Sequence, residues 1–378
     1  MGKLSSGGFM KNGKQGKFEK KTICLIAAMI ALTAMLSPRV CTAADNAATG
    51  VEKSQAASNS VAVSSDIPKI TSVADSIKTF RALKDANEKG NYQRAIATFK
   101  PKNEKDVLDL IDIWAENNQK GELHGAARQS LANITEKDKD MEPIFVKLLR
   151  EGRVNDKLIA IGKCSMFRSK KALPDIFTYM KKAVSIEPSK EDGLLAINAA
   201  NALPNYGVDA LPELLKMAKD PIYPKISKQL ILDTIGEIRD TKAIPQFLSI
   251  LKDKSQPIEI RQVAIETLGW IGTSEPMYEL MEMYKTEQDV FVRSGIISAV
   301  GNAKNEAAIP FLRGILMNDS EANKKGLAVN ALCKIGTAKS QEILLESFGK
   351  EKNKLVRENL AVALRELTGK NYDWRLPE

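Results

Sequence analysis

Histidine and cysteine are scarce in this sequence, although metal sites and nucleophilic catalysis depend heavily on them. The 378 residues include one histidine, His124, and four cysteines. A zinc site needs three or four ligands, and the sequence offers only Glu122 close to His124. It also lacks a nucleophile-elbow motif and a GxxxxGK[ST] phosphate loop. We therefore expect no metal, no cofactor, no catalytic residue, no small-molecule substrate and a protein that is not an enzyme.

The cysteines are too few for a disulfide framework. Cys24 and Cys41 lie within the first 44 residues, which leaves Cys164 and Cys333 in the rest of the chain. We expect these two to be small buried side chains rather than reactive thiols, because unpaired cysteine is often buried.

A concentrated basic patch, which nucleic-acid binding requires, is missing once the first 44 residues are set aside. The net charge is +9, but residues 1–44 hold seven basic residues against one acid. The remainder of the chain is therefore nearly balanced, and we expect no nucleic-acid partner.

A hydrophobic run long enough to cross a bilayer is also missing. The apolar run Ile23–Leu36 has 14 residues, whereas a membrane-spanning helix needs about 20. Lysines precede this run, and the small residues Ala43 and Ala44 follow it, which is the pattern of a cleavable export signal. We expect residues 1–44 to be a signal peptide that directs the protein to the periplasm or cell envelope. An uncleaved anchor, which would be the only membrane contact, and lipidation at Cys41 are alternatives.

Four further segments follow the signal. Residues 45–70 are rich in Ala, Ser and Asn and predict a flexible linker. Residues 71–104 predict an N-terminal helical cap of two helices with a break at Lys89-Gly90-Asn91. Residues 105–370 predict eight repeats. Residues 371–378 predict a C-terminal tail, and we expect the aromatic residues Tyr372 and Trp374 to fold back over the last repeat.

The repeats are defined by a column of mostly basic residues near the start of the second helix of each unit. At 32-residue intervals the column contains Arg261, Arg293, Lys325 and Arg357, and at intervals of 33 to 36 residues before them Lys228, Gly193, Lys157 and His124. The residues three and seven positions after each of these are apolar. Apolar residues at helical spacing form one face of a helix. Each unit therefore predicts two amphipathic helices that bury their apolar faces by stacking on neighbouring units.

Proline and glycine form further columns. A proline recurs near the start of the first helix, where its missing N–H costs little: Pro143, Pro174, Pro212, Pro245, Pro276 and Pro310. Glycine recurs near the end of the second helix, at Gly236, Gly269 and Gly301. We expect these glycines to end the helix in the left-handed conformation.

This pattern resembles the HEAT-repeat family, and specifically its shorter bacterial units, the phycobilisome-lyase-like HEAT repeats. One unit, residues 242–273, reads KAIPQFLSILKDKSQPIEIRQVAIETLGWIGT. The resemblance implies an all-α fold, namely an α-solenoid that forms a right-handed superhelix of about eight helix pairs. It also implies that the second helices line the concave face.

The basic residues of the column are the candidate functional site in this sequence. They are Lys157, Lys228, Arg261, Arg293, Lys325 and Arg357. We predict that this basic column binds a protein partner, such as an acidic segment, along the concave face. In the alternative, each base pairs with an acid in the turn before it, such as Asp253, Glu287, Asp319 or Glu351. The leading hypothesis is an exported, non-enzymatic scaffold. A structural component of a cell-envelope assembly and a lyase-like or metal-dependent enzyme with the same repeats are the alternatives.

Overall fold

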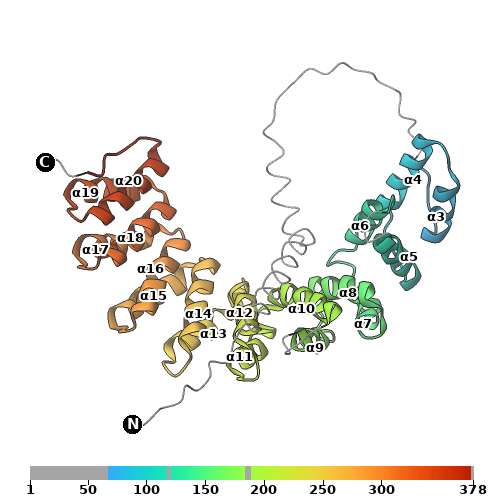
Figure 1. The fold of residues 1–378 in the computed structure, drawn as a ribbon, viewed down its shortest axis with the longest axis horizontal. Helices are drawn as coiled ribbons and strands as arrows, with labels where there is room; N and C mark the ends of the chain where they lie inside the picture. Colours follow the sequence, from blue (N-terminus) through green and yellow to red (C-terminus); the bar gives the residue numbers. More distant parts are fainter. Residues whose placement is uncertain (1–66, 117–120, 184–188, 376–378) are drawn as a thin grey trace, which may run out of the picture. The chain divides into compact units, whose positions relative to one another are not determined.

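The structure is a computed structural model that describes residues 67–116, 121–183 and 189–375. The predicted signal peptide and nearly all of the predicted linker lie outside these residues. Within them the chain forms 18 α-helices and no strand (Figure 1), so the all-α fold is confirmed. No helix in the described ranges combines the length and the apolar character that crossing a bilayer requires.

The chain divides into two compact units, which are described separately. Among the described residues, the N-terminal unit contains 67–116, 121–161 and 189–198, and the C-terminal unit contains 162–183 and 199–375. In the N-terminal unit lie α3 (Val73–Ala82), α4 (Ala86–Thr98), α5 (Glu104–Ala115), α6 (His124–Ala132) and α7 (Glu142–Glu151). Two helices, α8 (Val154–Met166) and α10 (Lys190–Ala202), contribute residues to both units.

The C-terminal unit holds the longer run of helices. Its first helices are α9 (Leu173–Ala183), α11 (Leu211–Lys219), α13 (Ile244–Lys252), α15 (Ser274–Thr286), α17 (Ile309–Asn318) and α19 (Ala338–Lys350). Its second helices are α12 (Lys225–Gly236), α14 (Ile258–Ile271), α16 (Val290–Asn302), α18 (Ala322–Ile335) and α20 (Lys354–Thr368). In chain order, α5 contacts α6 in the N-terminal unit. In the C-terminal unit the successive contacting pairs are α11 and α12, α13 and α14, α15 and α16, α17 and α18, and α19 and α20. Proline occupies one of the first two positions of α7, α11, α13 and α17, as predicted.

The break between the first two helices differs from the prediction. Helix α4 runs through Gly90, and the break falls at residues 83–85. There the Asp85 carboxylate accepts hydrogen bonds from the backbone N–H groups of Asn87 and Glu88, both at 2.9 Å. An aspartate N-cap satisfies two otherwise unpaired donors, whereas one glycine inside a helix costs only about 1 kcal/mol. The Asp85 N-cap therefore determines where α4 begins.

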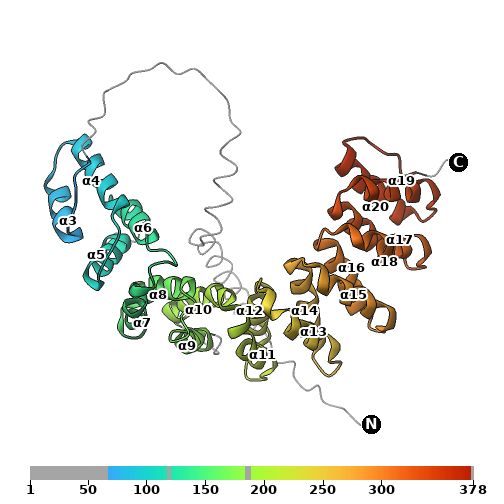
Figure 2. The ribbon, with the colours of Figure 1, turned by 180° about the vertical axis from the view of Figure 1, so that it is seen from behind.

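The C-terminal unit has two layers of helices from α11 onward (Figures 1 and 2). The second helices α12, α14, α16, α18 and α20 contact one another in series, and each also packs on the first helix of its own pair. The buried core lies between the layers and includes Phe247, Leu268, Ile296 and Leu332. The side of the second helices that faces away from the first helices remains available at the surface.

The glycine column has a different role from the one predicted. Gly269 and Gly301 lie inside α14 and α16, and the left-handed residues that end second helices come later, for example Gly272 with φ of 70°. A Cβ atom on Gly269 would lie 2.6 Å from the Ala299 Cα of the next second helix, and one on Gly301 would lie 2.6 Å from the Ala331 Cα. These two glycines therefore allow adjacent second helices to approach closely.

The C-terminal tail packs on the last repeat, as predicted for its aromatic residues. The Tyr372 ring meets the Phe348 ring edge-on, with centroids 5.7 Å apart. The Lys354 ammonium lies 4.9 Å from the centroid of the Trp374 ring. Both aromatic side chains are half-buried, so the tail covers part of α19 and α20.

Candidate functional site

Arg261, in the middle of the basic column, is buried rather than exposed. Its Nε donates to the carbonyl oxygen of Leu251, in the last turn of its own first helix, at 3.1 Å. Its Nη2 lies 2.5 Å from Oε2 of Glu287, which begins the turn before the next second helix. The two side chains are only 7% and 5% exposed. Arg261 therefore joins its own first helix to the following repeat.

Lys325 forms the corresponding ion pair with the following repeat, two repeats later. Its Nζ lies 2.9 Å from Oε2 of Glu351. In each turn the other carboxylate oxygen accepts backbone N–H groups: Glu287 Oε1 accepts those of Gln288 and Asp289, and Glu351 Oε1 accepts those of Lys352 and Asn353. We call these ion pairs the ladder. In each of them the base pairs with an acid that lies 26 residues later in the sequence, in the following repeat. The predicted pairing within a repeat, with the acid upstream, is not what the structure has at these two positions.

The pKa values of the two ladder acids follow from these contacts. Burial alone would raise the pKa of Glu287, but the Asp289 N–H and the Arg261 guanidinium outweigh burial, so the pKa lies below its ordinary value. The pKa of Glu351 is lowered in the same way, against burial, by the Asn353 N–H and by Lys325. Both carboxylates are therefore held ionised, and their charge is compensated inside the fold.

Two other members of the column are occupied by aromatic contacts. The Arg293 guanidinium lies 4.3 Å from the centroid of the Tyr284 ring, and the Arg357 guanidinium lies 4.2 Å from that of Phe348. Arg357 also donates to the carbonyl oxygens of Phe348 and Trp374. The C-terminal tail therefore supplies one of the acceptors of Arg357.

The remaining column positions show the same placement near the start of a second helix. Lys157 in α8 and Lys228 in α12 are half-buried. The residue 26 positions after Lys228 is Lys254, so no acid of the next repeat is available at the ladder spacing. His124 begins α6, and its Nδ1 lies 2.8 Å from the Trp114 carbonyl oxygen in the last turn of α5. This repeats the Arg261 contact with its own first helix, so His124 has a structural role here.

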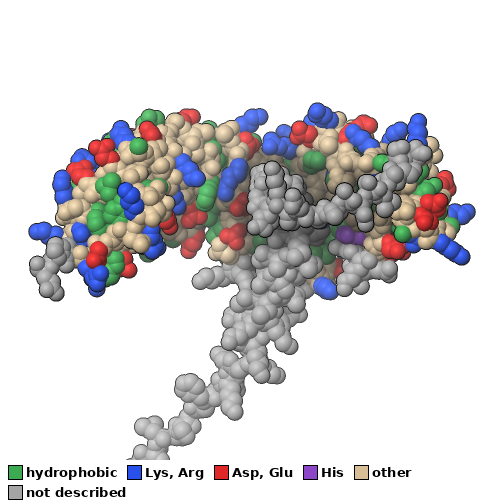
Figure 3. Space-filling model, turned by 90° about the horizontal axis from the view of Figure 1, so that it is seen from above, with side chains coloured by type: hydrophobic (Ala, Val, Ile, Leu, Met, Phe, Trp, Pro, Cys, Tyr) green, Lys and Arg blue, Asp and Glu red, His purple; other side chains and the backbone are tan. Residues whose placement is uncertain are grey.

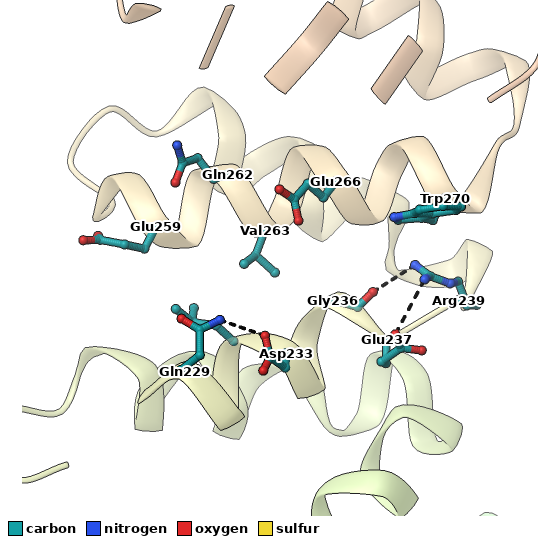
Figure 4. Close-up of a pocket in the computed structure, with 11 residues that line it drawn as sticks. Gln229, Asp233, Gly236, Glu237, Arg239, Glu259, Gln262, Val263, Glu266 and Trp270 are labelled. Carbon is teal, nitrogen blue, oxygen red and sulfur yellow. Dashed lines mark hydrogen bonds and ion pairs between the residues drawn. The ribbon is translucent and has the colours of Figure 1, made fainter. Parts of the chain in front are cut away.

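A groove lies between the second helices α12 and α14 of the C-terminal unit. It has a volume of about 380 Å³. Its walls are formed by Gln229, Leu232, Asp233, Gly236, Glu237, Arg239, Glu259, Gln262, Val263, Glu266 and Trp270. Figure 4 shows Val263 pointing from α14 towards α12, and Gln229 and Asp233 pointing from α12 towards α14. Sequence reasoning based on the basic column missed this groove.

The groove is acidic, with four carboxylates and one guanidinium. The Asp233 Oδ1 accepts from the Gln229 amide at 2.8 Å. At one end the Arg239 guanidinium lies 5.4 Å from the centroid of the Trp270 ring and 3.9 Å from a Glu237 carboxylate oxygen (Figure 4). Among the described residues, Glu259 and Glu266 have no side-chain hydrogen bond or ion pair. Their charges are therefore available to a ligand.

Large apolar side chains are also exposed on the second helices. Trp270 in α14 is 57% exposed, Phe291 in α16 is 66% exposed and Leu355 in α20 is 56% exposed. Val290 and Val362, on α16 and α20, are exposed as well. Figure 3 shows hydrophobic side chains at the surface between acidic and basic ones on one face of the molecule. We call the exposed side of α12, α14, α16, α18 and α20 the second-helix face.

Neither remaining cysteine offers a nucleophile. Cys164 is fully buried, as predicted. The pKa of the half-buried Cys333 thiol is raised to about 11 by burial and by the nearby Glu366 carboxylate. A thiol with that pKa stays protonated at neutral pH and reacts slowly. No group of three or more His, Cys, Asp and Glu side chains in the described segments is placed to hold a metal ion.

Comparison with known families finds HEAT repeats in the second half of the chain. The family model described as HEAT repeats matches residues 224–301 and 288–365. These ranges contain α12 to α20 apart from short ends, and hence the groove, the ladder and the second-helix face. A search of curated proteins found no match.

Two solved structures with similar folds are enzymes by name. Human deoxyhypusine hydroxylase in complex with glycerol is 16% identical, with 71% of this chain and 97% of that chain covered and a TM-score of 0.31. The complex of CpcE and CpcF of phycocyanin lyase from Nostoc is also 16% identical, with 62% and 90% covered and a TM-score of 0.29. The expectation that the protein is not an enzyme is therefore corrected, since proteins named as a hydroxylase and a lyase are similar to this chain. At these scores neither likeness transfers an activity to it.

Proposed function

We propose that this chain, a HEAT-repeat protein over residues 224–365, binds a partner protein along its second-helix face. The observation that carries the proposal is the exposure of large apolar side chains on three second helices, α14, α16 and α20, together with the groove that Trp270 of α14 helps to line. Exposed apolar groups of this size rimmed by polar residues are typical of protein-binding surfaces. Tryptophan is also among the residue types that contribute most to binding.

The proposal moves the binding site away from the basic column. Arg261 and Lys325 already have carboxylate partners inside the fold, and Arg293 lies against an aromatic ring. Breaking a buried ion pair to bind an acidic segment would leave Glu287 or Glu351 uncompensated, which is costly. The second-helix face makes no such demand, because its apolar side chains are already at the surface.

The first helices of the C-terminal unit expose fewer large apolar side chains than the second helices do. Among the described residues of the C-terminal unit, they have two exposed large apolar residues, Tyr278 on α15 and Leu345 on α19. Isolated apolar side chains are ordinary on protein surfaces. The difference between the two layers therefore favours the second helices as the binding side.

Binding along this face is required equally of a scaffold, of a structural component of an envelope assembly and of an enzyme that acts on a protein. The proposal covers all three classes. With the export signal predicted for residues 1–44, we place this binding in the periplasm or cell envelope.

The test is site-specific photo-crosslinking of the full-length chain in an extract of cell-envelope proteins. A photoreactive phenylalanine replaces Phe291 or Leu355 on the second-helix face, and Tyr278 or Leu345 in the matched controls. We expect the same discrete crosslinked partner, identified by mass spectrometry, from both second-helix positions and from neither control. Crosslinks of equal yield at all four positions, or at none, would contradict the proposal.

A further inference from the structure

The groove between α12 and α14 differs in charge from the rest of the second-helix face. Carboxylates come from both of its walls, Asp233 and Glu237 from the α12 side and Glu259 and Glu266 from α14. Arg239 is the one basic residue in its lining. Asp233 and Glu266 hold the same position in consecutive repeats, five residues after the column residues Lys228 and Arg261. An electronegative groove favours a ligand of opposite charge.

Two of the four groove acids differ from other acids of the C-terminal unit, which pair with a basic side chain of the fold. Glu279 pairs with Lys252, Glu346 pairs with Arg313, and Glu287 pairs with Arg261. Glu259 and Glu266 have no such partner among the residues that the structure describes. A cation that enters the groove can therefore pair with these carboxylates without breaking an existing contact.

Trp270 adds a second kind of cation recognition at one end of the groove. Its ring already has a guanidinium near it, that of Arg239, at 5.4 Å from the ring centroid. More than half of the Trp270 side chain remains exposed. Guanidinium and ammonium groups are attracted to the face of an indole, and an exposed tryptophan beside carboxylates suits a lysine or arginine side chain with its apolar stem.

The dimensions of the groove fit a short extended peptide. The α14 wall of the groove runs from Glu259 to Trp270, which corresponds to about 17 Å at 1.5 Å per residue. An extended chain rises about 3.3 Å per residue, so about five residues of a partner can lie along the groove. Alternate side chains of such a segment point the same way, and three of them would face the groove.

Resting on the proposed function, we propose that this groove binds an extended, cationic segment of the partner protein, with lysine or arginine at alternate positions. One cationic side chain pairs with Glu266, with its stem against the exposed Trp270 ring, and another pairs with Glu259. The apolar residues Phe291 and Leu355 then hold other parts of the same partner. The partner segment is thus basic in the groove, opposite in charge to the acidic segment that the basic column had suggested.

The test is calorimetric titration of the full-length chain with the peptide acetyl-(Arg-Ser)₃-amide at low salt. The Glu259→Gln/Glu266→Gln double variant should bind this peptide about tenfold more weakly, a change that two weakened charge contacts readily supply. Trp270→Ala should weaken binding as well. The matched control is Glu275→Gln/Glu342→Gln, which removes the same charge from two exposed positions on the first helices α15 and α19. This control should bind like the unmodified protein.

Three results would overturn the inference. The first is equal binding of a peptide with citrulline in place of arginine. The second is spermidine binding as tightly as the peptide, which would mean that the groove merely collects cations. The third is tighter binding of a peptide with the sequence of residues 11–21, which would make this chain its own occupant.

If the arginine peptide fails while crosslinking at Phe291 and Leu355 succeeds, the inference is wrong and the proposed function stands. If crosslinking fails while the arginine peptide binds as expected, the function along the whole face is wrong.

Discussion

Arg261 and Glu287 lie 26 residues apart in consecutive repeats, and their side chains form a buried ion pair with Nη2 and Oε2 2.5 Å apart. Lys325 and Glu351 form the corresponding pair at the same spacing. Each pair connects one helix pair to the next, in a fold where repeats contact mainly their neighbours. The basic column is thus part of what fixes one repeat on another.

Replacement of Arg261 by alanine should destabilise the C-terminal unit strongly. The change leaves the Glu287 carboxylate buried without its partner, which typically costs about 3–5 kcal/mol of unfolding free energy. Lys252→Ala is the control, because it breaks an exposed pair with Glu279, and such pairs contribute about 0–1 kcal/mol. Urea unfolding followed by circular dichroism measures both. Equal losses in the two variants would mean that the Arg261 pair is no more important than a surface pair.

Acid should weaken the structure through the same two carboxylates. The folded-state pKa values of Glu287 and Glu351 lie below the ordinary 4.5. Above that pH both states are ionised and the full stabilisation is present. As the pH falls below about 4.5, the unfolded chain takes up protons first, so stability is lost progressively towards the folded-state pKa. Urea midpoints measured from pH 7 to pH 3 should fall less steeply in Glu287→Gln than in the unmodified protein. An unchanged slope would show that Glu287 does not contribute to the acid sensitivity.

Arg293→Glu should reduce stability more than Lys254→Glu. The Arg293 guanidinium is half-buried against Tyr284, and a carboxylate there loses the cation–π contact and lies near Asp319 and Glu321, which act electrostatically on Arg293. We expect a loss of about 1–2 kcal/mol. Lys254 is exposed, so its reversal should change stability by less than about 0.5 kcal/mol. Thermal unfolding of both variants decides the matter, and equal shifts would mean that the column position has no special role.

The sequence predicted the helix pairs well because their apolar spacing and early prolines are local signals. It predicted the ladder only in part. Arg261 was predicted as a column residue and Glu287 as an acid that pairs with the column, but periodicity gives a position within a repeat and leaves open which repeat supplies the partner. The true pairing depends on how adjacent helix pairs stack, which is a tertiary property.

The groove was missed for a related reason. Its acids Asp233 and Glu266 form a short exposed column that ends after two repeats, since the same position holds Ser298, Asn330 and Val362 further on. A search for columns common to all repeats passes over such a feature. The exposed Trp270 was the available signal, because a tryptophan outside the apolar columns has no place in the repeat core.

Gly269 and Gly301 provide a test of how tightly the second helices pack. A Cβ on either residue would lie 2.6 Å from the Cα atom of an alanine on the next helix, a distance that forces the backbones apart. Gly269→Ala and Gly301→Ala should each cost about 1–3 kcal/mol, the usual penalty for overpacking a core. Gly236 occupies the same column, but a Cβ there would meet only the Val263 Cγ1 at 3.8 Å, an ordinary contact. Gly236→Ala should therefore be neutral or should stabilise the protein by about 0.5–1 kcal/mol, because alanine favours the helix. Urea unfolding of the three variants measures these differences. If all three variants were stabilised alike, the second helices would not be in the close contact that places Ala299 and Ala331 against these glycines.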